Sequence, residues 1–219
     1  MIRKGGKRLA IVALTASVVV GMAAVSPAAD DDGFKELFNG KDLSGWKTIL
    51  AGKGDPDKTF KVEDGAIIVS GNPAGYFYTD KSFKNYVLRY DWRFKRPKGL
   101  KDDEKFGGNS GLLVHITGKH TIWPKSVEVQ GENRTHANIF AIGGAKGSFK
   151  FNQAALRKVR KPVGDWNTTE VICKDGAITA KVNGTTVSSG KGNLTEGPFG
   201  FQSEGAEIHF KNIKIKTLE

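Results

Sequence analysis

Three of the chain's four histidines fall between residues 107 and 140, together with a glutamate and a glutamine on an alternating apolar run. Imidazole and carboxylate groups transfer protons, and amide groups bind hydroxyls, so these side chains suit chemistry on a polar ligand such as a sugar. His115 lies in one alternating run, and Glu128 and Gln130 lie in the next. Runs of this kind predict two neighbouring strands with polar groups on one face.

The alternation predicts which side chains share that face. Leu112, Val114 and Ile116 point to one side of the first strand, which leaves His115 on the other side. The valines flanking Glu128 likewise point away from the glutamate. We therefore expect His115 and Glu128 to meet on one polar sheet face.

The loops around this face supply further candidates for ligand binding. Together with Gln130, the predicted substrate-binding residues are Asn109, Ser110, Trp123, Lys125 and His136. A divalent metal, if one is used, would be held by His115, Glu128 and His136, although no compact metal-ligand spacing is visible. Neither the metal nor any other cofactor is fixed by the sequence. The alternative for His136 is an exposed loop histidine.

The first 29 residues differ in composition from the rest of the chain. Basic residues at the start precede an apolar run, and small residues follow at Ser26–Ala29. This pattern is typical of a bacterial signal peptide, and the apolar run is short for a membrane span. We expect a secreted or periplasmic protein with no stable membrane insertion after cleavage. An uncleaved membrane anchor is the alternative.

Residues 30–219 have the length of a single domain with a sizeable core. The leader holds four basic residues and no acidic ones, so its removal lowers the formal charge from +11 by four to +7. The remaining basic residues are dispersed and no nucleic-acid recognition motif accompanies them, so we expect no nucleic-acid partner. One cysteine, Cys173, excludes an internal disulfide, and its place in an apolar run indicates a strand residue.

Short apolar runs separated by turn signals predict an all-β fold. Tyr86–Phe94 alternates aromatic with polar residues, and Asp64-Gly65, Asp175-Gly176 and Asn183-Gly184 are hairpin turns. The polar side of Tyr86–Phe94 either joins the Glu128 face or is simply solvated. Only the stretch around residues 153–158 favours a helix. The predicted fold is a two-sheet antiparallel sandwich or jelly roll.

Six motifs occur in the order found in a known family. They are residues 37–46, Gly108–Gly111, Glu128–Gln130, Gly164–Asn167, Val182–Gly184 and Phe210–Ile215. Together they span almost all of the chain after the leader. In these motifs the chain resembles the 3-keto-disaccharide hydrolase domain family, long classed as a domain of unknown function.

The resemblance implies a concanavalin-like jelly roll that acts on a glycoside or oligosaccharide. Members are linked to cleavage of glycosides oxidised to a ketone at C3, by elimination or by the hydration that follows. The positions it carries over are Asn109, Ser110, Glu128 and Gln130. Many members have an arginine where this chain has His115.

The implied chemistry needs a base, because a C3 ketone acidifies the C2–H bond and the resulting enolate can expel the C1 substituent. His115 and Glu128 are the candidate catalytic residues, and His115 is favoured near neutral pH. A non-catalytic carbohydrate-binding module on the same fold is the alternative. An ordinary glycosidase needs two carboxylates, and the strand that carries Glu128 offers only one.

Overall fold

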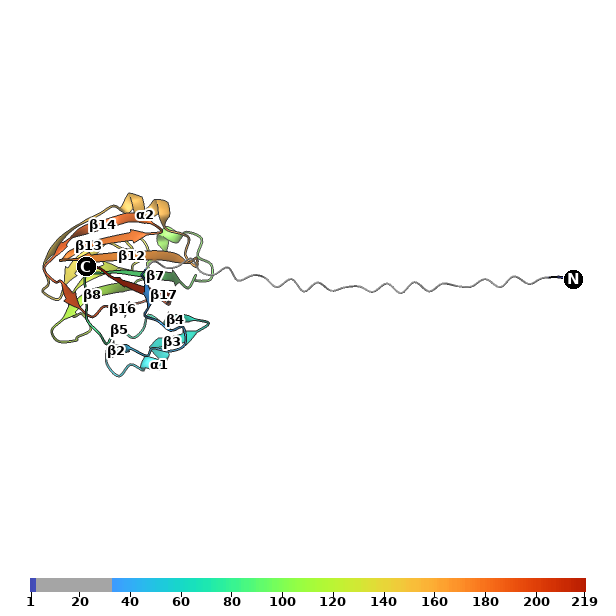
Figure 1. Cartoon of the computed structure of the whole chain (residues 1–219), viewed down its shortest axis with the longest axis horizontal. Helices are drawn as coiled ribbons and strands as arrows, with labels where there is room; N and C mark the ends of the chain where they lie inside the picture. The colour runs from blue at the N-terminus through green and yellow to red at the C-terminus, as the bar shows by residue number, and fades with distance from the viewer. Residues whose placement is uncertain (3–32) are drawn as a thin grey trace. The chain divides into compact units, whose positions relative to one another are not determined.

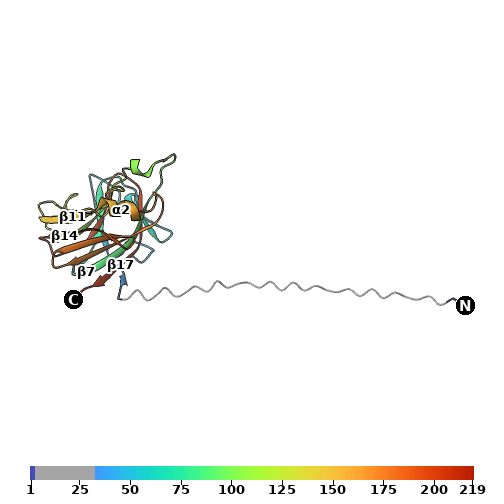
Figure 2. The same cartoon turned by 90° about the horizontal axis from the view of Figure 1, so that it is seen from above.

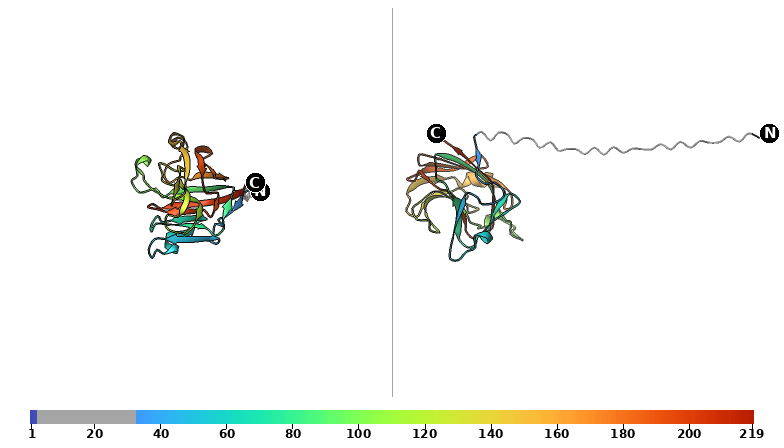
Figure 3. Two further views of the ribbon diagram at one scale, coloured as in Figure 1. Left: turned by 90° about the vertical axis from the view of Figure 1, so that its left-hand side faces the viewer. Right: turned by 60° about the horizontal axis from the view of Figure 1, so that its bottom comes forward.

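The structure is a computed structural model that describes residues 1–2 and 33–219. From residue 33 onward, antiparallel strands dominate the ribbon (Figures 1 and 3). The predicted all-β sandwich of two sheets is therefore confirmed. The predicted signal peptide falls almost entirely on residues outside the described part, and the boundary between residues 29 and 30 stays a prediction.

The larger sheet has nine strands and carries the long central strands of the fold. In spatial order they are β11 (Gly147–Phe151), β14 (Thr185–Gly192), β13 (Ala177–Val182), β12 (Asn167–Lys174), β7 (Tyr86–Phe94), β17 (Ile208–Thr217), β4 (Ala66–Val69) and β3 (Phe60–Glu63), with β1 (Lys35–Glu36) also pairing with β17. Figure 1 shows most of this order from β14 down to β3. The first and last strands, β1 and β17, are therefore neighbours in this sheet.

The smaller sheet has six strands and carries the predicted polar face. Its order is β10 (Ile139–Ile142), β9 (Lys125–Gln130), β8 (Gly111–Thr117), β16 (Gly200–Ser203), β5 (Gly75–Thr79) and β2 (Trp46–Leu50). A separate pair joins β6 (Phe83–Lys84) to β15 (Glu196–Gly197). The run with His115 and the run with Glu128 are thus neighbouring antiparallel strands, as predicted.

Helices are short in the described part of the chain. They are α1 (Pro56–Thr59), the 3-10 turn η1 (Asp103–Lys105) and α2 (Gln153–Val159). The helix expected near residues 153–158 is α2, which is capped by Asn152 and packs against β14 (Figure 2). Outside residues 3–32, no helix is long and apolar enough to cross a membrane.

The hairpin turns follow from the residues that form them. Asp64 and Gly65 both have positive φ, 49° and 72°, and so join β3 to β4 in a tight turn that matches strand twist. Asn183 and Gly184, at 47° and 84°, join β13 to β14 in the same way. The turn chemistry thereby fixes the register of strands that lie in the larger sheet.

The core lies between the two sheets and is rich in aromatic rings. Alternate residues of β7, from Tyr86 to Phe94, are buried, as predicted. Tyr90 of the larger sheet packs edge-on against Phe201 of the smaller sheet, with ring centroids 5.0 Å apart. Cys173 is a buried residue of β12 without a disulfide. Since β7 buries one face here, its polar side chains form the outer surface of the larger sheet and do not join the Glu128 face.

Candidate active site

Glu128 is held in the middle of β9 on the face of the smaller sheet that points away from the core. Val127 and Val129, its neighbours, are buried in the core between the sheets. Across the ladder Glu128 lies opposite Leu113 on β8 and Phe140 on β10. Only 5% of the Glu128 residue surface is exposed. Strand alternation therefore places a nearly buried carboxylate on an outer sheet face.

This carboxylate lines a cavity of about 250 Å³. The other residues around the cavity are Asn109, Trp123, Gln130, Phe140, Ile142 and Glu204. The lining combines two carboxylates and two amides with aromatic and aliphatic side chains. Such a mixture, mostly apolar with a few converging polar groups, is usual in sites for small organic ligands.

Gly111 leaves space for the side chains of Glu128 and Gln202. It lies on β8 between β9 and β16, and a Cβ atom built there would come 2.7 Å from Glu128 Oε1 and clash with Gln202 Oε1. Gln202 is fully buried on β16, opposite Tyr76 of β5. The second glycine of the Gly108–Gly111 motif is therefore required by packing, because any side chain would displace Glu128 or Gln202.

Glu204 is the second carboxylate of the cavity. It follows β16 directly, and its backbone bridges to Asn109. Burial, and then the charge on Glu204, raise the pKa of Glu128 to about 7, while the Gln202 amide opposes the shift. Burial also raises the pKa of Glu204, with the Asn109 side chain acting in the opposite direction. The ionisation of Glu128 is therefore coupled to the charge on Glu204.

His115 does not lie on the Glu128 face, and the expectation that the two side chains meet is wrong. A bulge interrupts the β8–β9 ladder between Val114 and Thr117, and His115 has a φ of 55°. The bulge turns the His115 ring into the sandwich, where it packs edge-on against Tyr86 with centroids 5.8 Å apart. Ile116 consequently takes the outward position beside Leu113.

The buried position of His115 also changes its acid–base behaviour. Burial lowers the pKa of His115 to about 4, and the backbone at Leu194 opposes this shift. The imidazole is therefore neutral at physiological pH. A ring enclosed between the sheets does not reach a ligand in the Glu128 cavity, which His115 does not line.

His136 is a second interior histidine, not a member of the cavity. Its ring stacks on Trp92 with centroids 3.8 Å apart, and Nε2 lies 2.9 Å from the Thr169 hydroxyl oxygen. Burial lowers the pKa of His136 to about 3. The predicted metal ligands His115, Glu128 and His136 therefore do not converge. Within the described residues, no group of three or more His, Cys, Asp or Glu side chains is arranged to hold a metal.

Comparison with known proteins places these features in a family. The model of the 3-keto-alpha-glucoside-1,2-lyase-like domain matches residues 33–216. The chain belongs to this family. It is also 23% identical, over 245 aligned residues, to the 3-keto-disaccharide hydrolase of Bacteroides thetaiotaomicron, covering 87% of this chain and 80% of the relative.

Solved structures share the fold of this 3-keto-alpha-glucoside-1,2-lyase-like domain. A Parabacteroides distasonis protein provisionally assigned as a glycosyl hydrolase has a TM-score of 0.62 and 26% identity, covering 86% of this chain and 95% of its own. A carbohydrate-binding module from Bacillus subtilis has a TM-score of 0.51 and 13% identity, with 79% and 96% covered. The Bacillus licheniformis β-glucanase has a TM-score of 0.51 and 10% identity, with 85% and 97% covered. The last two show the jelly-roll fold alone.

The other predicted site residues of this lyase-like domain fall into two groups. Asn109, Trp123 and Gln130 line the cavity with Glu128. Ser110 is buried and donates a 2.8 Å hydrogen bond to the Gln202 carbonyl oxygen, so it joins β8 to β16. Lys125 is exposed at the start of β9 and is not among the lining residues.

Two residues beside Glu128, Gln202 and Glu204, were not among the site residues predicted from the sequence. Gln202 and Glu204 lie in and after a separate apolar run, and only the pairing of β16 with β8 brings them to Glu128. Outside the cavity lining, His120 stacks on Tyr78 with ring centroids 4.4 Å apart. Its Nδ1 lies 3.0 Å from the Tyr76 hydroxyl. The sequence shows a carboxylate and an amide on or beside each of two alternating runs. It does not show which strands pair, so it could not bring Gln202 and Glu204 to Glu128.

Proposed function

We propose that the protein is a carbohydrate-active enzyme that cleaves 3-keto-glycosides, with Glu128 as the general base. The observation that carries the proposal is a nearly buried carboxylate, facing a ligand-sized cavity, whose pKa is raised to about 7. A base with this pKa is half ionised at neutral pH and strong enough to remove an activated proton. The family description, which names a 3-keto-glucoside, supports the choice of substrate.

The reaction begins with removal of the proton at C2. The C3 ketone accepts the electron pair of the C2–H bond as an enolate, and Glu128 receives the proton. The enolate then reforms the ketone, a C1–C2 double bond forms, and the bond from C1 to the leaving oxygen breaks. The leaving oxygen takes up one proton and departs as an alcohol. No oxidant or reductant is needed, because the C2–H electron pair becomes the C1–C2 double bond and the C1–O pair leaves with the alcohol.

Glu204 is placed to supply the proton to the leaving oxygen. It shares the cavity with Glu128, and burial raises its pKa, which favours the protonated form that a general acid needs. Addition of water to C1, with a proton returned to C2, then gives the free keto-sugar. The same pair of carboxyls therefore serves elimination and the hydration that makes the overall result a hydrolysis.

Amide groups are placed to bind the enolate oxygen and the sugar hydroxyls. Gln130 Oε1 accepts hydrogen bonds from the backbone N–H groups of Gly131 and Glu132, at 2.8 and 3.0 Å, which holds its amide in one orientation. Asn109 lines the same cavity. Preorganised donors of this kind stabilise negative charge that develops during the reaction. His115 has no role in these steps.

Trp123 favours a second candidate, a carbohydrate-binding module without turnover. It is 46% exposed and lines the same cavity, as an aromatic platform for a sugar ring would. A binding module needs the platform but no base with a pKa near neutrality. The two candidates therefore differ in what the loss of the Glu128 carboxylate does.

Turnover of a 3-keto-glucoside by the purified protein separates these candidates. We expect Glu128→Gln to lower turnover by about 10²–10⁴-fold, because the amide cannot accept the C2 proton. Glu196→Gln is the matched control, because Glu196 is exposed on β15 and outside the cavity lining. Saturable binding of the sugar by the wild type with no conversion would favour the binding module.

A further inference from the structure

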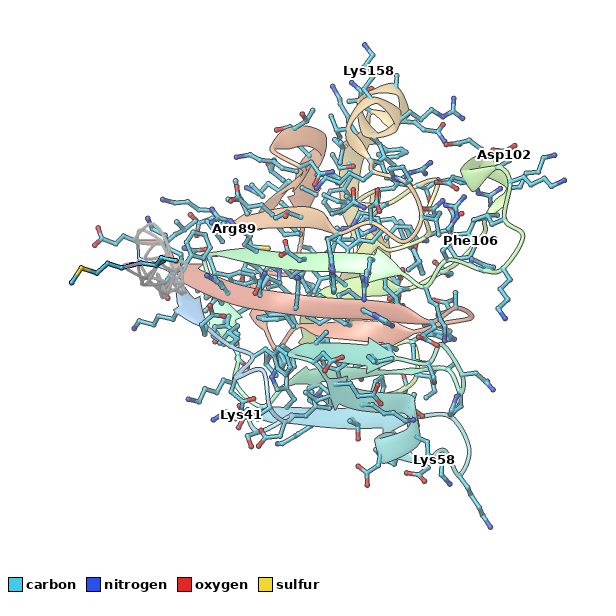
Figure 4. All side chains as sticks on the ribbon, turned by 90° about the vertical axis from the view of Figure 1, so that its right-hand side faces the viewer. Lys41, Lys58, Arg89, Asp102, Phe106 and Lys158 are labelled. Atoms are coloured by element: carbon cyan, nitrogen blue, oxygen red, sulfur yellow. The ribbon has the colours of Figure 1, made fainter. Side chains whose placement is uncertain are left out.

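A second hollow, of about 430 Å³, lies on the outer face of the larger sheet. It is formed by β7, β17, the β3–β4 hairpin and Trp166, which precedes β12. Figure 4 shows the side chains along this sheet, with Arg89 of β7 labelled. The hollow shares no lining residue with the Glu128 cavity, which belongs to the smaller sheet. It is therefore a separate site, with no part in the chemistry proposed above.

Trp166 holds two cations beside its indole ring. The guanidinium carbon of Arg93 lies 4.6 Å from the ring centroid, and Lys211 Nζ lies 4.3 Å from it. The indole face attracts each cation, while the two like charges repel each other. Among the residues that the structure describes, neither cation forms an ion pair with a carboxylate. The ring thus gathers two positive charges on one side of the hollow.

Glu207, a carboxylate that lines the hollow, is already engaged. Glu207 accepts a 2.9 Å contact from Lys95 Nζ through one oxygen, and His209 Nε2 lies 2.9 Å from the other. Arg93 Nε in turn donates to His209 Nδ1 at 3.4 Å. The contacts from Glu207 through His209 to Arg93 therefore hold the Arg93 side chain in place. The two Trp166-bound cations remain available to a ligand that approaches from solvent.

The rest of the hollow differs from the cationic end. The order β12, β7, β17, β4, β3 puts Ala66 and Ile68 beyond the cations, and Glu63 and Asp64 at the hairpin turn. Ile68 lies directly across the ladder from His209. A ligand that spans the hollow therefore meets cations, then an apolar floor, then carboxylate acceptors. A compact inorganic anion uses only the first of these.

We propose that this hollow binds a uronic-acid residue of an acidic oligosaccharide. Arg93 and Lys211 would hold the sugar carboxylate, since a guanidinium matches a carboxylate in two parallel hydrogen bonds. The C–H face of the sugar ring rests on Ile68 and Ala66, and its hydroxyls donate to Glu63 and Asp64. The hollow then anchors the protein to acidic glycan while the opposite sheet acts on its substrate.

Calorimetric titration with trigalacturonate tests the proposal, with maltotriose and sodium sulfate as comparison ligands. We expect saturable one-to-one binding of trigalacturonate, weaker by about tenfold or more in Lys211→Gln and in Arg93→Gln, since each loses a charge-assisted contact. Lys174→Gln removes the same charge at the exposed end of β12 and is expected to bind as the wild type does. Glu128→Gln is likewise expected to bind normally.

The other outcomes overturn the proposal in distinct ways. No binding of trigalacturonate rules out the site. Equal weakening by Lys174→Gln and Lys211→Gln would mean general charge attraction, and competition by sulfate at matched ionic strength would mean an unspecific anion site. Loss of binding in Glu128→Gln would place the acidic sugar in the catalytic cavity instead.

Discussion

Glu128 and Glu204 face the same cavity, from the middle of β9 and from the residue that follows β16, and the charge on Glu204 helps to raise the pKa of Glu128 to about 7. The two residues are distant in sequence and are brought together because β16 pairs with β8 and β8 pairs with β9. Their shared cavity makes the protonation of one depend on the other.

The Glu204→Gln variant tests this dependence. Removing the neighbouring negative charge leaves burial as the main cause of the raised pKa of Glu128. This pKa therefore moves down towards its ordinary value. In the wild type, kcat/KM should rise with pH through an apparent pKa of about 7. In the variant the rise should come at lower pH, as measured with a 3-keto-glucoside over pH 4–9. An unchanged midpoint would show that the two carboxyls are not coupled.

Stability should depend on pH in a way that Glu128 explains. Its pKa is raised in the folded state, so its contribution to stability is fully present below pH 4.5, the ordinary value, and is lost as pH rises through about 7. Glu128→Gln should therefore be more stable than the wild type at pH 8 by about 3 kcal/mol, and near equal to it at pH 4. Urea unfolding at both pH values measures the difference. A constant difference would mean that the carboxylate is not destabilised by burial.

His115 should be dispensable for turnover, and its burial should lower the stability of the folded protein at acidic pH. Its folded pKa is lowered to about 4 from 6.5, so its contribution is present above pH 6.5 and lost as pH falls towards 4. His115→Asn removes this titration, and Asn tolerates the positive φ of the bulge. Between pH 7 and pH 4 the variant should lose less stability than the wild type while keeping its turnover. A folded His115→Asn protein without activity would return His115 to the catalytic residues.

Trp123 should act on substrate binding more than on the chemical step. It is half exposed at the cavity and carries no group that transfers protons. Trp123→Ala should raise KM by about tenfold with little change in kcat, because a stacked ring stabilises bound substrate and transition state alike. Steady-state kinetics separates the two constants. A fall in kcat at unchanged KM would place Trp123 against the reacting atoms.

Local sequence patterns predicted most of the fold and part of the site. Alternation in β7 and β9 set their buried faces, and Asp64-Gly65 and Asn183-Gly184 fixed two hairpins, because these patterns act through neighbouring residues. No local sequence pattern predicted the bulge at His115. The bulge reverses the faces of the side chains that follow it in β8. Glu204 reaches Glu128 only through sheet pairing, which alternation does not specify.

The central claim is that Glu128 removes the C2 proton of a 3-keto-glycoside, and the most direct measurement is single-turnover cleavage of a 3-keto-glucoside carrying deuterium at C2. We predict that deuterium slows cleavage by the wild type, that Glu128→Gln stops it, and that Glu196→Gln behaves as the wild type does. Cleavage by Glu128→Gln at the wild-type rate, with the two isotopic substrates reacting equally fast, would contradict the account.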